Sequence, residues 1–190
     1  MKFRESGMPD IELWDSFFDA DFTLKELDVT SSITTLIDIG CGYGTFILAA
    51  AKLIKGEVIG IDIDHDTIKQ ARNEIQKHGL SKVQVLEGDI TQEDFFDTLK
   101  EYHVKVDYVC LFNMLHCEEP EKLLKQAYQL LRLGGKLGVI HWIYADTPRG
   151  PSMDIRPKPA QIIEWCRNVN FHLEKEVDLP PYHYGQVYVK

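Results

Sequence analysis

The sequence lacks an excess of basic residues, a long apolar run and a paired cysteine motif. With 21 Lys and Arg against 30 Asp and Glu, its formal net charge is −9. This balance argues against a nucleic-acid partner, because phosphate binding favours a basic surface. No apolar run is long enough to cross a bilayer, and the first ten residues do not form a signal peptide, so we expect a cytoplasmic protein with no membrane partner.

Redox and metal motifs are also missing. No Cys-x-x-Cys pair occurs, so we expect the four cysteines to be free thiols. Among the seven histidines there is no His-x-x-x-His spacing, and no cluster of Cys, His or carboxylate residues has ligand spacing. The sequence therefore predicts no metal ion.

Apolar and polar residues alternate in a way that predicts an α/β fold. We expect strands at 33–39, 58–61, 82–86, 104–112, 136–142, 171–179 and 186–190, and a tight turn at Gly134–Gly135. Helical spacing predicts helices at 11–18, 22–27, 46–54, 65–78, 92–99, 120–131 and 160–169. Strands that alternate with helices imply a parallel, Rossmann-like, doubly wound sheet with helices on both faces. The last two strands have too short a link for a crossover, so they should pair antiparallel.

The length of 190 residues suits one domain, 1–190, with residues 1–30 as a helical N-terminal cap and 31–190 as the core. We expect a monomer or a homodimer. The cap is apolar on one side, where Trp14 and Phe18 are candidates to cover a substrate pocket. The alternative is a helix that docks on the body through that apolar face.

A glycine-rich turn follows the first predicted strand, and the chain is organised around it. Residues 36–45 read Leu-Ile-Asp-Ile-Gly-Cys-Gly-Tyr-Gly-Thr, with Gly40, Gly42 and Gly44 at alternate positions. Glycines there let the backbone approach a ligand closely, and the start of the next helix offers free N–H groups. The strand–turn–helix order is typical of a nucleotide-cofactor site.

Asp38 decides which cofactor is expected. A dinucleotide fingerprint needs a third glycine where this chain has Thr45, and the turn contains no Lys or Arg. A carboxylate at Asp38 would repel a pyrophosphate and favour a ligand that carries an ammonium or a sulfonium. The pattern Asp-x-Gly-x-Gly-x-Gly resembles the first motif of the class I S-adenosylmethionine-dependent methyltransferases, in their small-molecule branch.

This resemblance covers residues 36–190 and implies S-adenosylmethionine as the cofactor. Its methionine part would pass the glycine turn, which includes Cys41. Asp62, about 20 residues after the turn at the end of the next strand, would hold the ribose hydroxyls, and Ile63 would lie against the adenine. The alternatives for Asp62 are a solvated strand-end acid or a helix cap, a role that Asp64 also offers.

Later segments carry further expected contacts. By the same resemblance, Asp89 would accept a hydrogen bond from the adenine amino group and the N–H of Ile90 would meet a ring nitrogen; the alternative is a turn-forming Gly-Asp pair. The strand that ends at Phe112 and Asn113 would lie beside the transferred methyl group. Asn113-Met114-Leu115-His116 lacks the two prolines of enzymes that methylate adenine or amide nitrogens.

Candidate catalytic and substrate residues lie near the ends of two strands. His116 is the first candidate for a general base and a substrate contact, and His141 is the second base candidate, because imidazole titrates near neutrality. The alternative for each histidine is a structural role as a packing residue rather than a base. In the proline-rich loop, Tyr144, Arg149 and Arg156 are substrate candidates, and two arginines favour an anionic acceptor. Their alternative is to anchor the loop through ion pairs with nearby acids.

We therefore expect a small-molecule methyltransferase that transfers the methyl group in line, with S-adenosylhomocysteine as the product. Three alternatives remain from the sequence: a nicotinamide-dependent oxidoreductase with the same architecture, a protein that binds S-adenosylmethionine without catalysis, and an aminopropyl transferase, against which the lack of an acidic pair for an amine acceptor counts. The sequence does not identify the acceptor.

Overall fold

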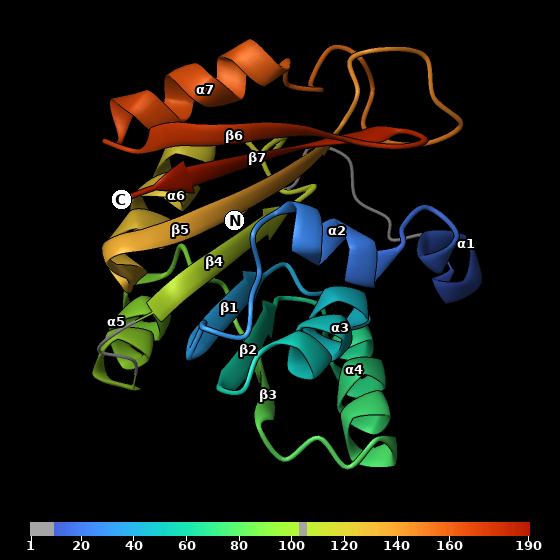
Figure 1. The fold of residues 1–190 in the computed structure, drawn as a ribbon, viewed down its shortest axis with the longest axis vertical. Helices are drawn as coiled ribbons and strands as arrows, with labels where there is room; N and C mark the ends of the chain where they lie inside the picture. Colours follow the sequence, from blue (N-terminus) through green and yellow to red (C-terminus); the bar gives the residue numbers. More distant parts are fainter. Residues whose placement is uncertain (1–9, 103–105) are drawn as a thin grey trace.

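The computed structural model describes residues 10–102 and 106–190, which form one seven-stranded sheet with helices on both faces (Figure 1). The strands are β1 (Thr35–Ile39), β2 (Glu57–Asp62), β3 (Val83–Glu87), β4 (Val106–Phe112), β5 (Leu131–Trp142), β6 (His172–Leu179) and β7 (His183–Val189). The helices are α1 (Ile11–Asp15), α2 (Ala20–Glu26), α3 (Thr45–Leu53), α4 (His65–Lys77), α5 (Glu93–Tyr102), α6 (Pro120–Leu130) and α7 (Pro159–Asn168).

The strand order is β3-β2-β1-β4-β5-β7-β6, and it confirms the predicted fold class. The pairs among β1 to β5 are parallel, whereas β7 runs antiparallel to both β5 and β6. The order reverses between β1 and β4, where the chain moves from one side of β1 to the other. In open α/β sheets, ligands bind beside such a switch point, at the carboxyl ends of the strands.

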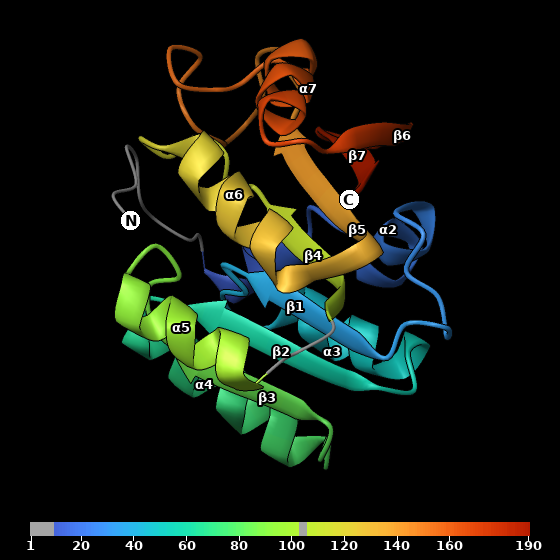
Figure 2. The same ribbon diagram turned by 90° about the vertical axis from the view of Figure 1, so that its left-hand side faces the viewer.

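Two apolar layers sandwich the sheet, because successive side chains of a strand point to opposite faces. In β1, Leu36 joins the layer beneath α2, α3 and α4, while Ile37 and Ile39 join the layer beneath α5, α6 and α7. Figure 2 shows α5 and α6 together on the near side of the sheet, with α3 and α4 behind it. Asp38 therefore points into the layer of α2 and α3.

Two predicted boundaries in the second half of the chain are corrected. The expected turn at Gly134–Gly135 lies inside β5, where pairing with β4 skips from Leu131 to Lys136 and the glycines form part of an irregularity; Gly134 has φ +73°. The last strand starts at His183 rather than at 186, and it pairs antiparallel with β6 as predicted. The first residues of the predicted strand 104–112 lie outside the described part of the chain.

The N-terminal segment forms two short helices, with the first shorter than predicted. Asp10 and Asp19 cap them by accepting hydrogen bonds from the N–H groups of Leu13 and Phe22. Leu24 and Leu27 are buried against α3 and the sheet. Docking through an apolar face, the alternative for the cap, is therefore what α2 does.

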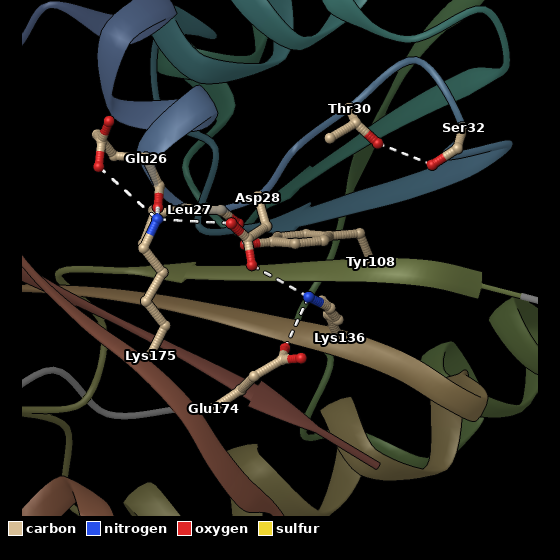
Figure 3. A network of polar contacts seen from close by, with 9 residues as sticks. All are labelled: Glu26, Leu27, Asp28, Thr30, Ser32, Tyr108, Lys136, Glu174 and Lys175. Atoms are coloured by element: carbon tan, nitrogen blue, oxygen red, sulfur yellow. Dashed lines mark hydrogen bonds and ion pairs between the residues drawn. The ribbon is translucent and has the colours of Figure 1, made fainter.

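A network of polar contacts fastens the end of α2 to the sheet (Figure 3). Lys175 of β6 donates to the Glu26 carbonyl at 2.7 Å, and its Nζ lies 3.5 Å from the Asp28 carboxylate. Lys136 of β5 forms ion pairs with Asp28 at 3.0 Å and with Glu174 at 2.6 Å. These groups are partly exposed, so each ion pair contributes little by itself.

The buried contact in the same region is the hydroxyl of Tyr108, which donates to the Leu27 carbonyl at 2.6 Å. Tyr108 lies on β4, and its hydroxyl occupies the space that a Cβ at Gly138 of β5 would need. A glycine on β5 thus makes room for the phenol to reach the N-terminal segment.

Tyr108→Phe tests this connection. We expect a loss of about 1–2 kcal/mol in the free energy of unfolding, because the buried Leu27 carbonyl loses its donor. Hydrogen exchange should also become faster in α2 than in the rest of the protein. Tyr188→Phe is the matched control, since Tyr188 is buried and its hydroxyl interacts with Gln186 of β7 and Cys166 of α7 rather than with the N-terminal segment. Equal exchange of α2 in both variants would contradict this role of Tyr108.

Candidate active site

A cavity of about 900 Å³ lies at the carboxyl ends of β1, β2, β4 and β5, at the switch point. Its size is within the usual range for small-molecule sites, about 300–1,000 Å³. The structure brings ten of the predicted site residues to its wall: Trp14, Asp38, Gly40, Cys41, Asp62, Ile63, Phe112, Asn113, His116 and Arg149.

The glycine turn needs its glycines. Gly40, Gly42 and Gly44 have φ of +81°, +51° and +92°, a region that side chains rarely adopt. A Cβ at Gly40 would also overlap the thioether of Met114. Gly44 is the N-cap of α3, and because it has no side chain it makes no side-chain hydrogen bond to the start of this helix.

Asp38 is a buried carboxylate, 1% exposed, at the end of β1. Its neighbours in register are Gly60 on β2, which has no side chain, and Cys110 on β4. Within the described part of the chain, Asp38 Oδ1 has no hydrogen-bond partner. Burial, and secondarily the charge of Asp62, raises the pKa of Asp38 to about 8.

Asp62 is held in place by backbone donors. Its Oδ2 accepts the Gly42 N–H at 2.8 Å, and its Oδ1 accepts the Asp64 N–H at 3.0 Å. The first bond ties the end of β2 to the glycine turn, and it leaves lone pairs on both oxygens for further donors. Asp64 serves as the cap of α4, accepting from Asp66 and Thr67. Asp62 thus binds the glycine turn, whereas Asp64 caps α4.

Of the three residues expected at the adenine, Ile63 lines the cavity, whereas Asp89 and Ile90 do not. Asp89 Oδ1 accepts both the N–H and the hydroxyl of Thr91, at 2.8 and 2.7 Å, which is the turn-forming role offered as the alternative. Ile90 is 2% exposed and belongs to the core. Their side chains, therefore, stabilise the start of the segment that leads to α5.

The two base candidates occupy different places. His116 lies on the cavity wall, in the loop after β4. His141, with its ring centroid 5.6 Å from that of His116, is fully buried and does not line the cavity. Burial lowers the pKa of His141 well below its ordinary value, and His183 is held neutral in the same way. His141 is therefore a buried packing residue, which was the alternative to a role as a base. His116 is the remaining base candidate.

The two arginines also separate. The Arg156 guanidinium is buried and donates to the carbonyl groups of Ile143, Ala145 and Pro151 at 2.8–3.0 Å. It anchors the loop, as the alternative proposed, but through backbone carbonyls rather than acids. Arg149 lines the cavity, whereas Tyr144 lies outside it, with Lys158 Nζ 4.7 Å from its ring centroid.

Aromatic rings form the wall opposite the acids. Phe17 packs edge-on against Trp142 at 5.3 Å, and Phe46 against Phe112 at 4.7 Å. Phe18, expected at the pocket, lies behind this wall against Phe46 and His183. Phe17 belongs to the N-terminal segment that the sequence predicted as a candidate flap over the pocket, whereas Trp142 was not assigned to the site, although it ends a strand on the ligand side of the sheet.

Comparisons with known proteins agree with this geometry. A family model described as a methyltransferase domain matches residues 30–182, most of the chain. The chain belongs to this methyltransferase family. The family and the fold imply S-adenosylmethionine as the cofactor, and they set aside the oxidoreductase alternative.

Among solved structures, a SAM-dependent methyltransferase from Aquifex aeolicus is similar with a TM-score of 0.78 at 21% identity, covering 90% of this chain and 89% of that one. The [4+2]-cyclase SpnF is similar with a TM-score of 0.72 at 17% identity, covering 90% and 80%. Likenesses at these identities show the fold alone, and the second shows that the fold also hosts other chemistry.

Among curated relatives, a 2-methyl-6-phytyl-1,4-hydroquinone methyltransferase from Oryza sativa subsp. japonica is 28% identical over 80% of this chain and 42% of its own length. A ribosomal protein L11 methyltransferase from Escherichia coli is 45% identical over 30% of this chain and 19% of its own length. The chain thus spans less than half the length of these relatives.

The site residues fit S-adenosylmethionine. The unpartnered Oδ1 of Asp38 is a buried acceptor at the place where a cationic ligand would be favoured. Asp62 offers two oriented oxygens for a diol, and Gly40 places no side chain between the turn and the cavity. No group of three or more His, Cys, Asp or Glu with metal-binding geometry occurs in residues 10–102 and 106–190, and no helix there is long and apolar enough to span a membrane.

Asp38→Asn tests the cost of the buried carboxylate. Because the pKa of Asp38 is raised from 3.8 to about 8, its stability penalty is absent below about pH 4 and grows as pH rises toward 8. We expect Asp38→Asn to unfold at a higher temperature than wild type at pH 8, with the difference shrinking toward pH 4, in calorimetric scans. Asp178→Asn, on the exposed edge strand β6, is the control. A difference that does not change with pH would contradict this assignment.

Proposed function

We propose that this protein transfers a methyl group from S-adenosylmethionine to a small-molecule acceptor bound in the same cavity. The observation that carries the proposal is the buried, unpartnered carboxylate oxygen of Asp38 beside the oriented carboxylate of Asp62. A cation bound at the glycine turn would stabilise the ionised form of Asp38, so the two acids favour a cationic nucleoside ligand over a diphosphate. The hydroquinone methyltransferase among the relatives, which matches over most of this chain, supports a small acceptor.

Protein and RNA substrates are less favoured. The relatives named as ribosomal protein L11 methyltransferase and as an uncharacterized RNA methyltransferase match only 30% and 36% of this chain. The net charge of −9 also disfavours a polyanion. The wall of the cavity, closed on one side by the rings of Trp14 and Phe17, suits a compact ligand.

The residues divide the work as follows. When bound, S-adenosylmethionine supplies an electron-poor methyl group on a sulfonium that leaves as a neutral thioether. Asp38 and the glycine turn would hold the amino acid part, and Asp62 the ribose hydroxyls. Phe112 and Asn113, at the end of β4, would border the reacting atoms and keep the acceptor in line. The chain thus contributes mainly proximity, orientation and exclusion of water.

His116 would act as a general base where the acceptor has a proton to lose. It is the one base candidate from the sequence that reaches the cavity wall. Its imidazole would accept the proton that the acceptor gives up and would release that proton to solvent.

Cofactor binding is tested by titrating S-adenosylmethionine and S-adenosylhomocysteine in a calorimeter. We expect both to bind wild type, and Asp62→Ala to weaken binding at least about tenfold, because each hydrogen bond to a charged group is worth about 1.5–3 kcal/mol. Asp178→Ala, an exposed acid far along the sheet, should bind as wild type does. The absence of any heat with wild type would end the proposal.

The role of His116 is tested by methyl transfer from labelled S-adenosylmethionine into a metabolite extract. We expect His116→Gln to lower the rate by a factor of about 10²–10⁴, the usual contribution of a general base, with unchanged affinity for the cofactor. His172→Gln, which alters an exposed histidine on β6, is the control. An unaltered rate in His116→Gln would mean that the acceptor needs no base from this chain.

A further inference from the structure

Charge is distributed unevenly over the cavity. The cofactor half, which comprises the lining residues between 38 and 70, contains all four carboxylates of the described wall: Asp38, Asp62, Asp64 and Asp66. The acceptor half comprises the other lining residues, from the N-terminal segment and from the loops after β4 and β5. It contains no described carboxylate, and its guanidinium belongs to Arg149.

The acceptor half is lined by flat aromatic surface. It contains the rings of Trp14, Phe17, Phe112 and Trp142, of which the last three are 4–6% exposed. Trp142 is fixed from behind by His183, at 4.2 Å between centroids, and edge-on by Phe17. Rings that are held in this way present a fixed apolar surface of small exposed area to the cavity, against which an aromatic ligand packs favourably.

Arg149 is positioned by the other arginine. Arg156 binds the carbonyl of Pro151 at 2.8 Å and that of Arg149 at 3.4 Å, so it grips the loop on both sides of Gly150. Gly150, at φ +109°, packs on the indole, and a Cβ there would come within 2.8 Å of Trp142. The backbone of Arg149 is therefore fixed next to the aromatic wall.

The Arg149 side chain is exposed, and no residue in the described ranges forms an ion pair with it. A guanidinium at the edge of an aromatic slot binds a carboxylate through two parallel hydrogen bonds. A cationic group on the acceptor would instead face this guanidinium and the positive sulfonium of the cofactor.

We propose that the acceptor is a planar aromatic compound that bears a carboxylate, with its ring on the wall of the acceptor half and its carboxylate on Arg149. This inference rests on the proposed function, since it assigns the other half of the cavity to the cofactor. Arg156 is a positioning residue that acts through the loop.

The test measures binding of matched probes to the full chain saturated with S-adenosylhomocysteine, by calorimetry. The probes are naphthoate, naphthylmethanol, naphthylmethylamine and the saturated decalin carboxylate. We expect naphthoate to bind about tenfold more tightly than the alcohol, because of the charged pair, and several-fold more tightly than the decalin acid, because of ring stacking. The amine should bind most weakly.

Arg149→Ala should weaken naphthoate about tenfold, to the level of the alcohol, and leave the alcohol unchanged. Arg167→Ala removes an exposed arginine of α7 outside the cavity and should change neither. The inference is overturned if naphthoate does not bind, if the amine binds best, if the decalin acid equals naphthoate, or if Arg149→Ala has no effect. Failure of the proposed function is separate, because it appears as no heat with S-adenosylhomocysteine itself.

Discussion

The burial of one carboxylate is the constraint around which the site is built. Asp38, the second-last residue of β1, has Gly60 on one side and Cys110 on the other, so neither neighbour in register donates a strong hydrogen bond to it. A buried charge without a partner is costly, and here the cost appears as a pKa near 8. The buried carboxylate lowers the folding stability of the free protein. A bound cation would offset this cost, so the same carboxylate increases the affinity for a cationic ligand.

The rest of the fold brings other groups to this acid. Parallel pairing aligns the carboxyl ends of the strands, so Asp62, Asn113 and Trp142 reach one edge although they lie far apart in the chain. The hydrogen bond from the Gly42 N–H to Asp62 joins the turn to the neighbouring strand. The polar network of Figure 3, at the other end of the N-terminal segment, holds that segment on the sheet, so its rings stay over the cavity.

Local signals in the sequence were enough for the core of the site. The glycine turn, Asp38, Asp62 and the cap at Asp64 are each defined by a few neighbouring residues, and the structure places them where the patterns indicate. The family assignment agrees with this part of the reading.

Long-range packing decided the positions that sequence reasoning did not find. No sequence pattern indicates that the Arg156 side chain binds loop carbonyls while Arg149 lines the cavity. The partners of Arg156 are backbone carbonyls, which any residue type would supply. The glycine pair at 134–135 predicts a turn, but pairing with β4 resumes beyond it and keeps the segment within β5. The aromatic wall joins Phe17 to Trp142, which are more than a hundred residues apart, and no periodicity links them.

Two buried histidines near the aromatic lining add no positive charge to the acceptor half of the cavity. His141 and His183 are buried with both ring nitrogens lacking partners in the described part of the chain, and burial keeps them uncharged at neutral pH. If either were protonated, the aromatic side would carry a second positive charge near a cationic cofactor and would compete with Arg149 for an anion. Because both stay neutral, Arg149 is the cationic side chain of the described acceptor half, and the four acids lie in the cofactor half. An electrostatic gradient of this kind favours a positive ligand at the acids and a negative ligand at the guanidinium, so two ligands of opposite charge are held in a fixed relative orientation.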